Sequence, residues 1–121
     1  MSTHTISVTF DASDQSFTFD PTSVDVASGE TASLVWNLST TNGSGGKTAT
    51  FNSPYITFDT SGTDPFGTPV TSNSDTTVTV SDDDTSSDDA GTFGYTVYVT
   101  YDGTNYDSDP QIVNKSPTGG P

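Results

Sequence analysis

Five aspartates within eight residues form the densest group of candidate metal ligands in the sequence. They belong to the run SDDDTSSDD and are Asp82, Asp83, Asp84, Asp88 and Asp89. Carboxylate oxygens are hard ligands, and Ca²⁺ takes roughly six to eight of them in variable geometry, so this run could hold calcium. The spacing is not that of an EF-hand, and the run has no Glu for bidentate closure. The alternative, which we favour, is a solvated acidic loop with no specific ion.

Aromatic residues beside aspartates form a second candidate group. Tyr101 and Tyr106 lie in the run YDGTNYDSD, and Tyr55 and Phe66 are further candidates near loops. Tyrosine rings can stack against sugar rings, so the pair Tyr101 and Tyr106 offers a ligand-binding platform for carbohydrate. The alternative is that these rings belong to the core, because the chain has few apolar side chains to fill one. The aspartates would then serve turns.

Catalysis has few candidate residues in this chain. The sequence holds one histidine, His4, and no cysteine. A Ser-His-Asp triad would have to use His4, which has no nucleophile motif near it, and we expect His4 to be an exposed residue at the start of a strand. Two carboxylates could cleave a glycoside only across a cleft, for which a small β domain has little room. We therefore expect no enzyme.

The charge of the chain excludes several classes of partner. Sixteen acidic residues against two lysines give a net charge of −14, which repels nucleic-acid phosphates and anionic lipids. The N-terminal residues show neither a signal peptide nor an apolar run long enough to span a membrane. We expect a soluble protein without membrane insertion, either cytoplasmic or the mature form of a secreted protein.

Two segments alternate between apolar and polar residues as half-buried strands do. One apolar face comprises Ala32, Leu34, Trp36 and Leu38, and the other comprises Phe93, Tyr95, Val97, Val99 and Tyr101. We predict that both faces contribute to one core. Its central residues are expected to be Trp36, Leu34, Phe93, Tyr95 and Val97.

Shorter alternating runs predict further strands between turn signals. These runs include 4–12, 17–19, 24–26, 48–51, 55–58, 76–82 and 110–114. Pro54 is expected to separate two strands, and residues 61–74 to form a long connection between two sheets. About eight strands without a helical period predict an all-β Greek-key β-sandwich. We expect one domain over residues 1–115 and a flexible tail over 116–121.

The order of these pieces resembles the cupredoxin fold family. The relevant pieces are the proline-bearing loop FTFDPTSVDV, the turn ASGET, the tryptophan strand LVWNL, the opening GTFGY and the final strand introduced by DPQIV. In copper-binding members, one His precedes a strand like KTATF, and a Cys and a second His follow the aromatic pair. The resemblance puts Lys47, Val97 and Thr100 at those three positions. Without imidazoles and a thiolate there, we expect no copper and no other cofactor apart from the calcium considered above.

A second resemblance is to immunoglobulin-like domains. It rests on Asp89, Gly91, Phe93 and Tyr95, with Phe93 in the place of the corner tyrosine. Both families are Greek-key sandwiches, so the choice between them does not alter the expected function.

A non-catalytic structural or protein-interaction module is the function that these features favour. A sandwich exposes edge strands that invite pairing, and here only Pro21, Pro54, Pro110 and the aspartates would protect them. We therefore expect a protein partner or self-association through a sheet edge. The alternative is a calcium-assisted or carbohydrate-binding module.

Overall fold

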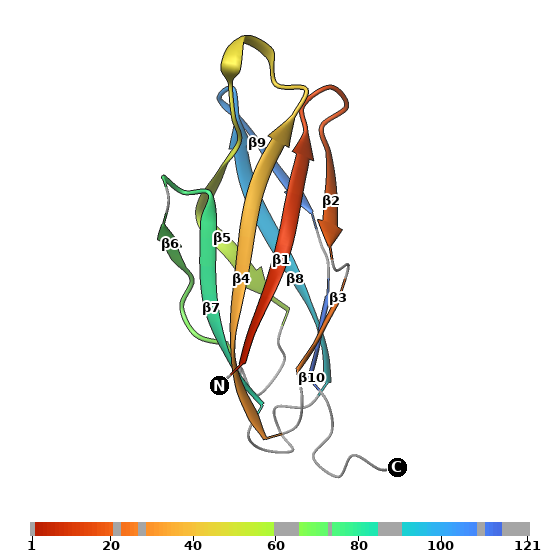
Figure 1. The fold of residues 1–121 in the computed structure, drawn as a ribbon, viewed down its shortest axis with the longest axis vertical. Coiled ribbons are helices and arrows are strands. Elements are labelled where there is room, and N and C mark those ends of the chain that lie inside the picture. Colours follow the sequence, from red (N-terminus) through yellow and green to blue (C-terminus); the bar gives the residue numbers. More distant parts are fainter. Residues whose placement is uncertain are drawn as a thin grey trace.

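Two β-sheets pack face to face in the computed structural model of the chain (Figure 1). The structure describes residues 2–20, 23–26, 29–59, 66–72, 74–84, 91–108 and 111–114; the side chains at 2, 23, 84, 91, 92 and 111–114 are outside this description. The predicted all-β sandwich is confirmed. Throughout these residues, no helix is long and apolar enough to cross a lipid bilayer.

The first sheet holds five strands in the order β2-β1-β4-β7-β6. Their bounds are β1 (Ser2–Asp11), β2 (Ser16–Asp20), β4 (Glu30–Thr41), β6 (Val70–Ser72) and β7 (Thr77–Asp84). The central strands β1 and β4 run parallel, and the other neighbours are antiparallel. Strands β2 and β6 form the two edges.

The second sheet has the order β3-β10-β8-β5, with β9 also paired to β8. Its bounds are β3 (Ser23–Val26), β5 (Thr50–Phe58), β8 (Gly91–Tyr101), β9 (Thr104–Ser108) and β10 (Gln111–Asn114). A 3-10 turn (η1, Ser44–Gly46) precedes β5. Figure 1 shows β5 and β6 on one side of the sandwich and β2 and β3 on the other.

The chain passes between the sheets where the sequence predicts a connection. Strand β5 belongs to the second sheet and β6 to the first, so the predicted crossing within residues 61–74 is confirmed. Strand β6 itself was not expected in that stretch. The separation at Pro54 was also wrong, because β5 continues through Pro54 and accommodates it by a register shift between Phe51 and Ile56.

The last hairpin turns at Asp102 and Gly103. Both residues have positive φ, 51° and 76°, which is the requirement of a type I′ turn and explains the Asp-Gly pair there. The register that pairs Val97 with Ser108 also pairs Gly94 with Gln111. Strands β9 and β10 therefore share one continuous antiparallel register along β8.

The predicted core is confirmed. The alternating residues of β4 and β8 are buried, and Trp36 is fully buried among them. The indole Nε1–H of Trp36 donates to the hydroxyl of Tyr95 at 3.0 Å, and the two ring centroids lie 5.3 Å apart. This contact joins the first sheet to the second at the centre of the sandwich.

Loss of this hydrogen bond should destabilise the protein. The substitution Tyr95→Phe leaves the buried Trp36 donor without its acceptor, so we expect a loss of about 1–3 kcal/mol in the free energy of unfolding. Urea unfolding followed by tryptophan fluorescence measures it. Tyr98→Phe, which removes a hydroxyl on the outer face of the same strand, is the matched control and should cost less. Equal losses would contradict the importance of the buried bond.

Burial also affects stability at high pH. Burial raises the pKa of Tyr95 to about 12, against an ordinary value of 10.0. The unfolded chain therefore loses this proton first, so the Tyr95 contribution is fully present below about pH 10 and is lost as the pH rises toward 12. Between about pH 10 and pH 12, the melting temperature should fall more steeply with pH for the natural protein than for Tyr95→Phe. Parallel curves would show that Tyr95 does not titrate as expected.

Candidate functional site

The aspartates of the acidic run do not share one surface. Asp82 and Asp83 are neighbours on β7 and point to opposite faces of the sheet. Asp82 is fully buried, whereas Asp83 is exposed and accepts a hydrogen bond of 2.9 Å from the hydroxyl of Thr31. The side chain of Asp84, and Asp88 and Asp89 entirely, lie outside the described residues.

The expectation of an acidic loop was wrong for residues 82–84. They continue β7, because the antiparallel pairing with β4 extends until Glu30 lies opposite Asp84. Within the described parts of the chain, no group of three or more His, Asp or Glu side chains could hold a metal ion. Calcium binding by the complete run stays an untested alternative.

A buried polar end of the first sheet was not predicted. His4 Nε2 lies 3.2 Å from Glu30 Oε1, and both side chains are about three-quarters buried, with 28% and 22% exposed. His4 is therefore not the exposed residue that we expected, because it shares the inward face of β1 with Ile6. Alternation puts Glu30 and Asp82 on the inward faces of β4 and β7 at the same end.

The structure places Tyr101 and Tyr106 against the core. Tyr101 is only 8% exposed, and its ring centroid lies 5.5 Å from that of Phe10. Tyr106 is half-buried, with its ring centroid 5.1 Å from the same phenylalanine. Both rings face inward from the last hairpin, so the two do not form an exposed platform. The alternative reading of Tyr101 as a core residue describes it correctly.

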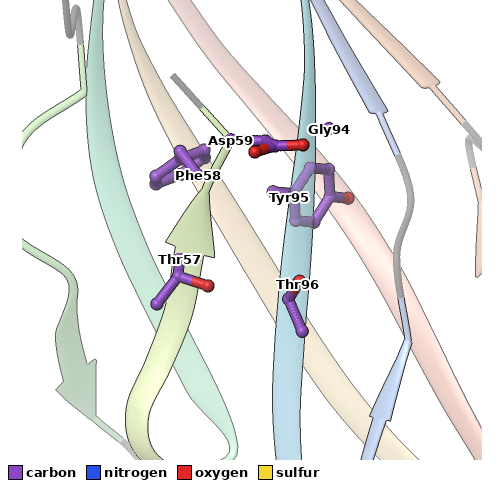
Figure 2. Close-up of a pocket in the computed structure, with 6 residues that line it drawn as sticks. All are labelled: Thr57, Phe58, Asp59, Gly94, Tyr95 and Thr96. Atoms are coloured by element: carbon purple, nitrogen blue, oxygen red, sulfur yellow. The ribbon is translucent and has the colours of Figure 1, made fainter. Parts of the chain in front are cut away.

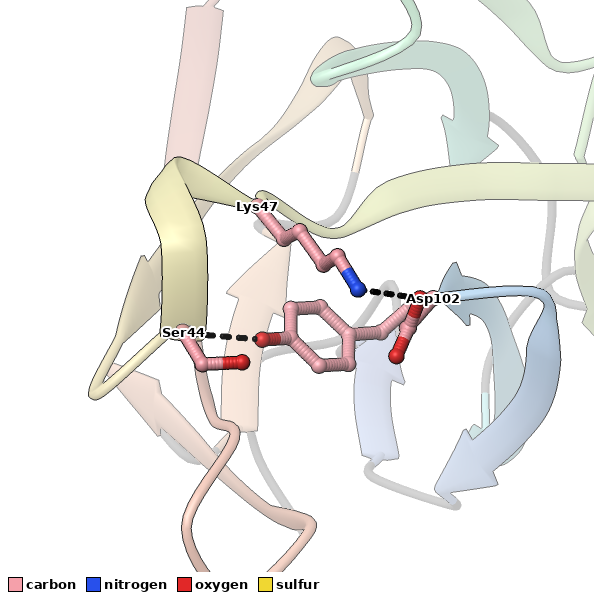
Figure 3. A network of polar contacts seen from close by, with 4 residues as sticks. Ser44, Lys47 and Asp102 are labelled. Carbon is pink, nitrogen blue, oxygen red and sulfur yellow. Dashed lines mark hydrogen bonds and ion pairs between the residues drawn. The ribbon is translucent and has the colours of Figure 1, made fainter.

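Two polar contacts hold the loop before β5 on the last hairpin (Figure 3). The backbone N–H of Ser44 donates to the hydroxyl of Tyr101 at 3.0 Å. The ammonium of Lys47 lies 2.8 Å from the carboxylate of Asp102, and this hydrogen bond, with the attraction of opposite charges, raises the pKa of Lys47. Both charged side chains are about half exposed, so the pair contributes little to stability.

The three positions that the resemblance assigns to copper ligands lie in different surroundings. Lys47 is paired with Asp102 in the exposed loop. Val97 is fully buried, and Thr100 projects from the opposite face of β8, where its hydroxyl donates to Asn105 at 2.8 Å. Alternation therefore separates the second and third positions. That the protein lacks copper stays a prediction.

A groove of about 360 Å³ opens where β5 ends beside β8 (Figure 2). Its lining is Thr57, Phe58, Asp59, Gly94, Tyr95 and Thr96. The backbone N–H of Asp59 donates to the carbonyl of Gly94 at 2.8 Å and ties the end of β5 to β8. This groove was not predicted from the sequence. The sequence feature that could have predicted it is the polar face of β8, where Gly94 interrupts a row of threonines.

The edge strands differ in how they are protected. Strands β2, β3 and β9 each carry an aspartate, namely Asp20, Asp25 and Asp107. Strand β5 contains Pro54 and a register shift in its ladder with β8. Strand β6 has no charged residue, and its Val70 is 63% exposed, the one exposed large hydrophobic residue in the described ranges.

Comparisons with known proteins identify no relative: no family model matches this sequence, and no curated protein matches it.

The acidic run should respond to cations without selectivity for calcium. Any cation screens repulsion among the carboxylates, and Asp82 and Asp83 point to opposite faces, so we expect Ca²⁺ and Mg²⁺ at equal ionic strength to raise the melting temperature equally. Thermal unfolding in both salts measures this. A rise specific to Ca²⁺ that disappears in the double substitution Asp83→Asn, Asp88→Asn would contradict the expectation and establish a calcium site.

Proposed function

We propose that this protein is a non-catalytic, copper-free structural module that associates with a second copy of itself through strand β6. The observation that carries the proposal is the uncharged edge of β6 with its exposed Val70. The proposal includes a Greek-key, cupredoxin-like class for the sandwich. The positions of the quoted sequence pieces support that class: the proline-bearing loop falls between β2 and β3, and the tryptophan strand is the central β4.

The distribution of charge distinguishes β6 from the rest of the surface. Residues 66–72, FGTPVTS, contain no acid or base in a chain whose net charge is −14. This segment lies along β7, through a bridge between Phe66 and Asp82 and then through β6. Its other side is an edge with backbone groups that a further strand can pair. Charged side chains are one common means of blocking natural edges, and their absence here favours pairing.

Long-range repulsion between copies opposes this association. Each copy carries −14, and exposed charges interact across roughly 8 Å at physiological ionic strength and farther in dilute salt. Added salt shortens that range and leaves the short-range contacts of an uncharged edge almost unchanged. We therefore expect association to increase with ionic strength.

The substitution Val70→Lys should prevent this association. The side chain is largely exposed, so the change should leave folding intact, while a lysine on the edge opposes pairing. Size-exclusion chromatography with light scattering at low and high salt measures the mass. The matched control is Thr18→Lys on the opposite edge strand β2, which changes the net charge equally and should still associate.

Two outcomes would contradict the proposal. A strict monomer at every salt concentration would remove self-association and leave only a different protein as partner. Association that survives Val70→Lys but is lost in Thr18→Lys would move the contact from β6 to β2.

A further inference from the structure

The floor of the groove between β5 and β8 is open because residue 94 is glycine. Gly94 is not among the residues with positive φ, so the backbone does not require glycine there. A Cβ built at this position would meet only Asp59, with Cβ and Oδ2 both at 3.8 Å, which is ordinary van der Waals contact. Neither strain nor crowding therefore explains the missing side chain. Its consequence is a recess on an outer face otherwise covered by threonine and tyrosine.

Hydroxyl groups and one carboxylate surround this recess. Thr57 and Thr96 face each other across the two strands, and Figure 2 shows Asp59 at the level of Gly94. The hydroxyl of Thr57 lies 3.0 Å from the hydroxyl of Tyr98, so the tyrosine reaches across from β8 to β5. The backbone hydrogen bond from Asp59 to Gly94 holds the carboxylate-bearing residue at the rim. Thr57 and Thr96 stand on paired strands, and Asp59 follows β5 directly, which limits the movement of these groups.

The chemistry of the lining selects a class of ligand. Threonine hydroxyls both donate and accept hydrogen bonds, whereas the Asp59 carboxylate only accepts them. A ligand with several neighbouring hydroxyls meets both requirements. An anionic ligand would be repelled by Asp59 and by the net charge of −14.

We infer that this groove binds a neutral saccharide, with Asp59 accepting hydrogen bonds from its hydroxyls and the recess at Gly94 receiving part of the ring. The volume of about 360 Å³ lies at the lower end of the usual range for small-molecule sites, and it suits one sugar unit. The site lies apart from Tyr101 and Tyr106, which face inward. It is also a function additional to pairing at β6.

The test is a titration of isotope-labelled protein with neutral disaccharides, followed by amide chemical shifts. The probes are maltose, cellobiose, lactose and chitobiose, with glucuronic acid as the anionic comparison. We expect at least one neutral probe to shift the amides of 57–59 and 94–96 at millimolar concentrations, and glucuronic acid to shift them less. The variant Val70→Lys should bind the same probe, which separates this test from that of self-association.

Matched substitutions identify the groups responsible. Asp59→Asn should weaken binding roughly tenfold or more, because it removes a charged acceptor. Asp107→Asn is its control: Asp107 is exposed on the same face of the sheet beside Tyr98, and the charge change is equal. Gly94→Thr continues the threonine row of β8 and should abolish binding without unfolding the protein, which amide shift dispersion verifies. Thr100→Val on the same face, outside the groove, should bind normally.

Three results would overturn the inference. The first is the absence of localised shifts with every probe. The second is equal weakening by Asp59→Asn and Asp107→Asn, which would indicate a general effect of charge. The third is a folded Gly94→Thr variant that binds as well as the natural protein.

Discussion

The contact between Trp36 and Tyr95 is the interaction on which the sandwich depends most. It joins the central strand of one sheet to the central strand of the other, and it satisfies the indole N–H away from water. Other aromatic rings extend from it toward both sides of the molecule: Phe58 contacts both Trp36 and Tyr95 and stacks on Phe66 at 3.9 Å, while Phe19 meets Tyr95 at 6.5 Å. A chain with only 28% hydrophobic residues thus concentrates its large side chains between the sheets.

This concentration leaves the outer surface to threonine, serine, asparagine and aspartate. Recognition at such a surface must use hydrogen bonds or strand pairing, because little apolar area remains outside for a conventional hydrophobic interface. The two surfaces proposed here follow from this constraint. Strand β6 offers unpaired backbone groups without charge, and the groove beside Gly94 offers hydroxyls and a carboxylate. Both lie on the side of the sandwich that carries β5 and β6.

Patterns between neighbouring residues predicted which strand residues are buried and where the last hairpin turns. Alternation placed Trp36 and Tyr95 in the core, and the pair Asp102-Gly103 is the usual signal for a tight hairpin turn. That turn also sets the register that brings Tyr106 opposite Val99, on the inward face. The inward position of Tyr106 could therefore have been predicted from the turn, whereas the neighbouring aspartates suggested an exposed platform.

The sequence by itself determined which face of each long strand is apolar, since side chains alternate with a period of two and burial follows that period. Only the tertiary structure decided which strands are neighbours. The three-residue strand β6 exists because β7 pairs with it, and Asp82 is buried because the ladder with β4 continues past the apolar residues. The groove likewise exists only because the end of β5 lies beside Gly94. Pairings between residues so distant in sequence form only as the whole core assembles. Local periodicity therefore does not predict them.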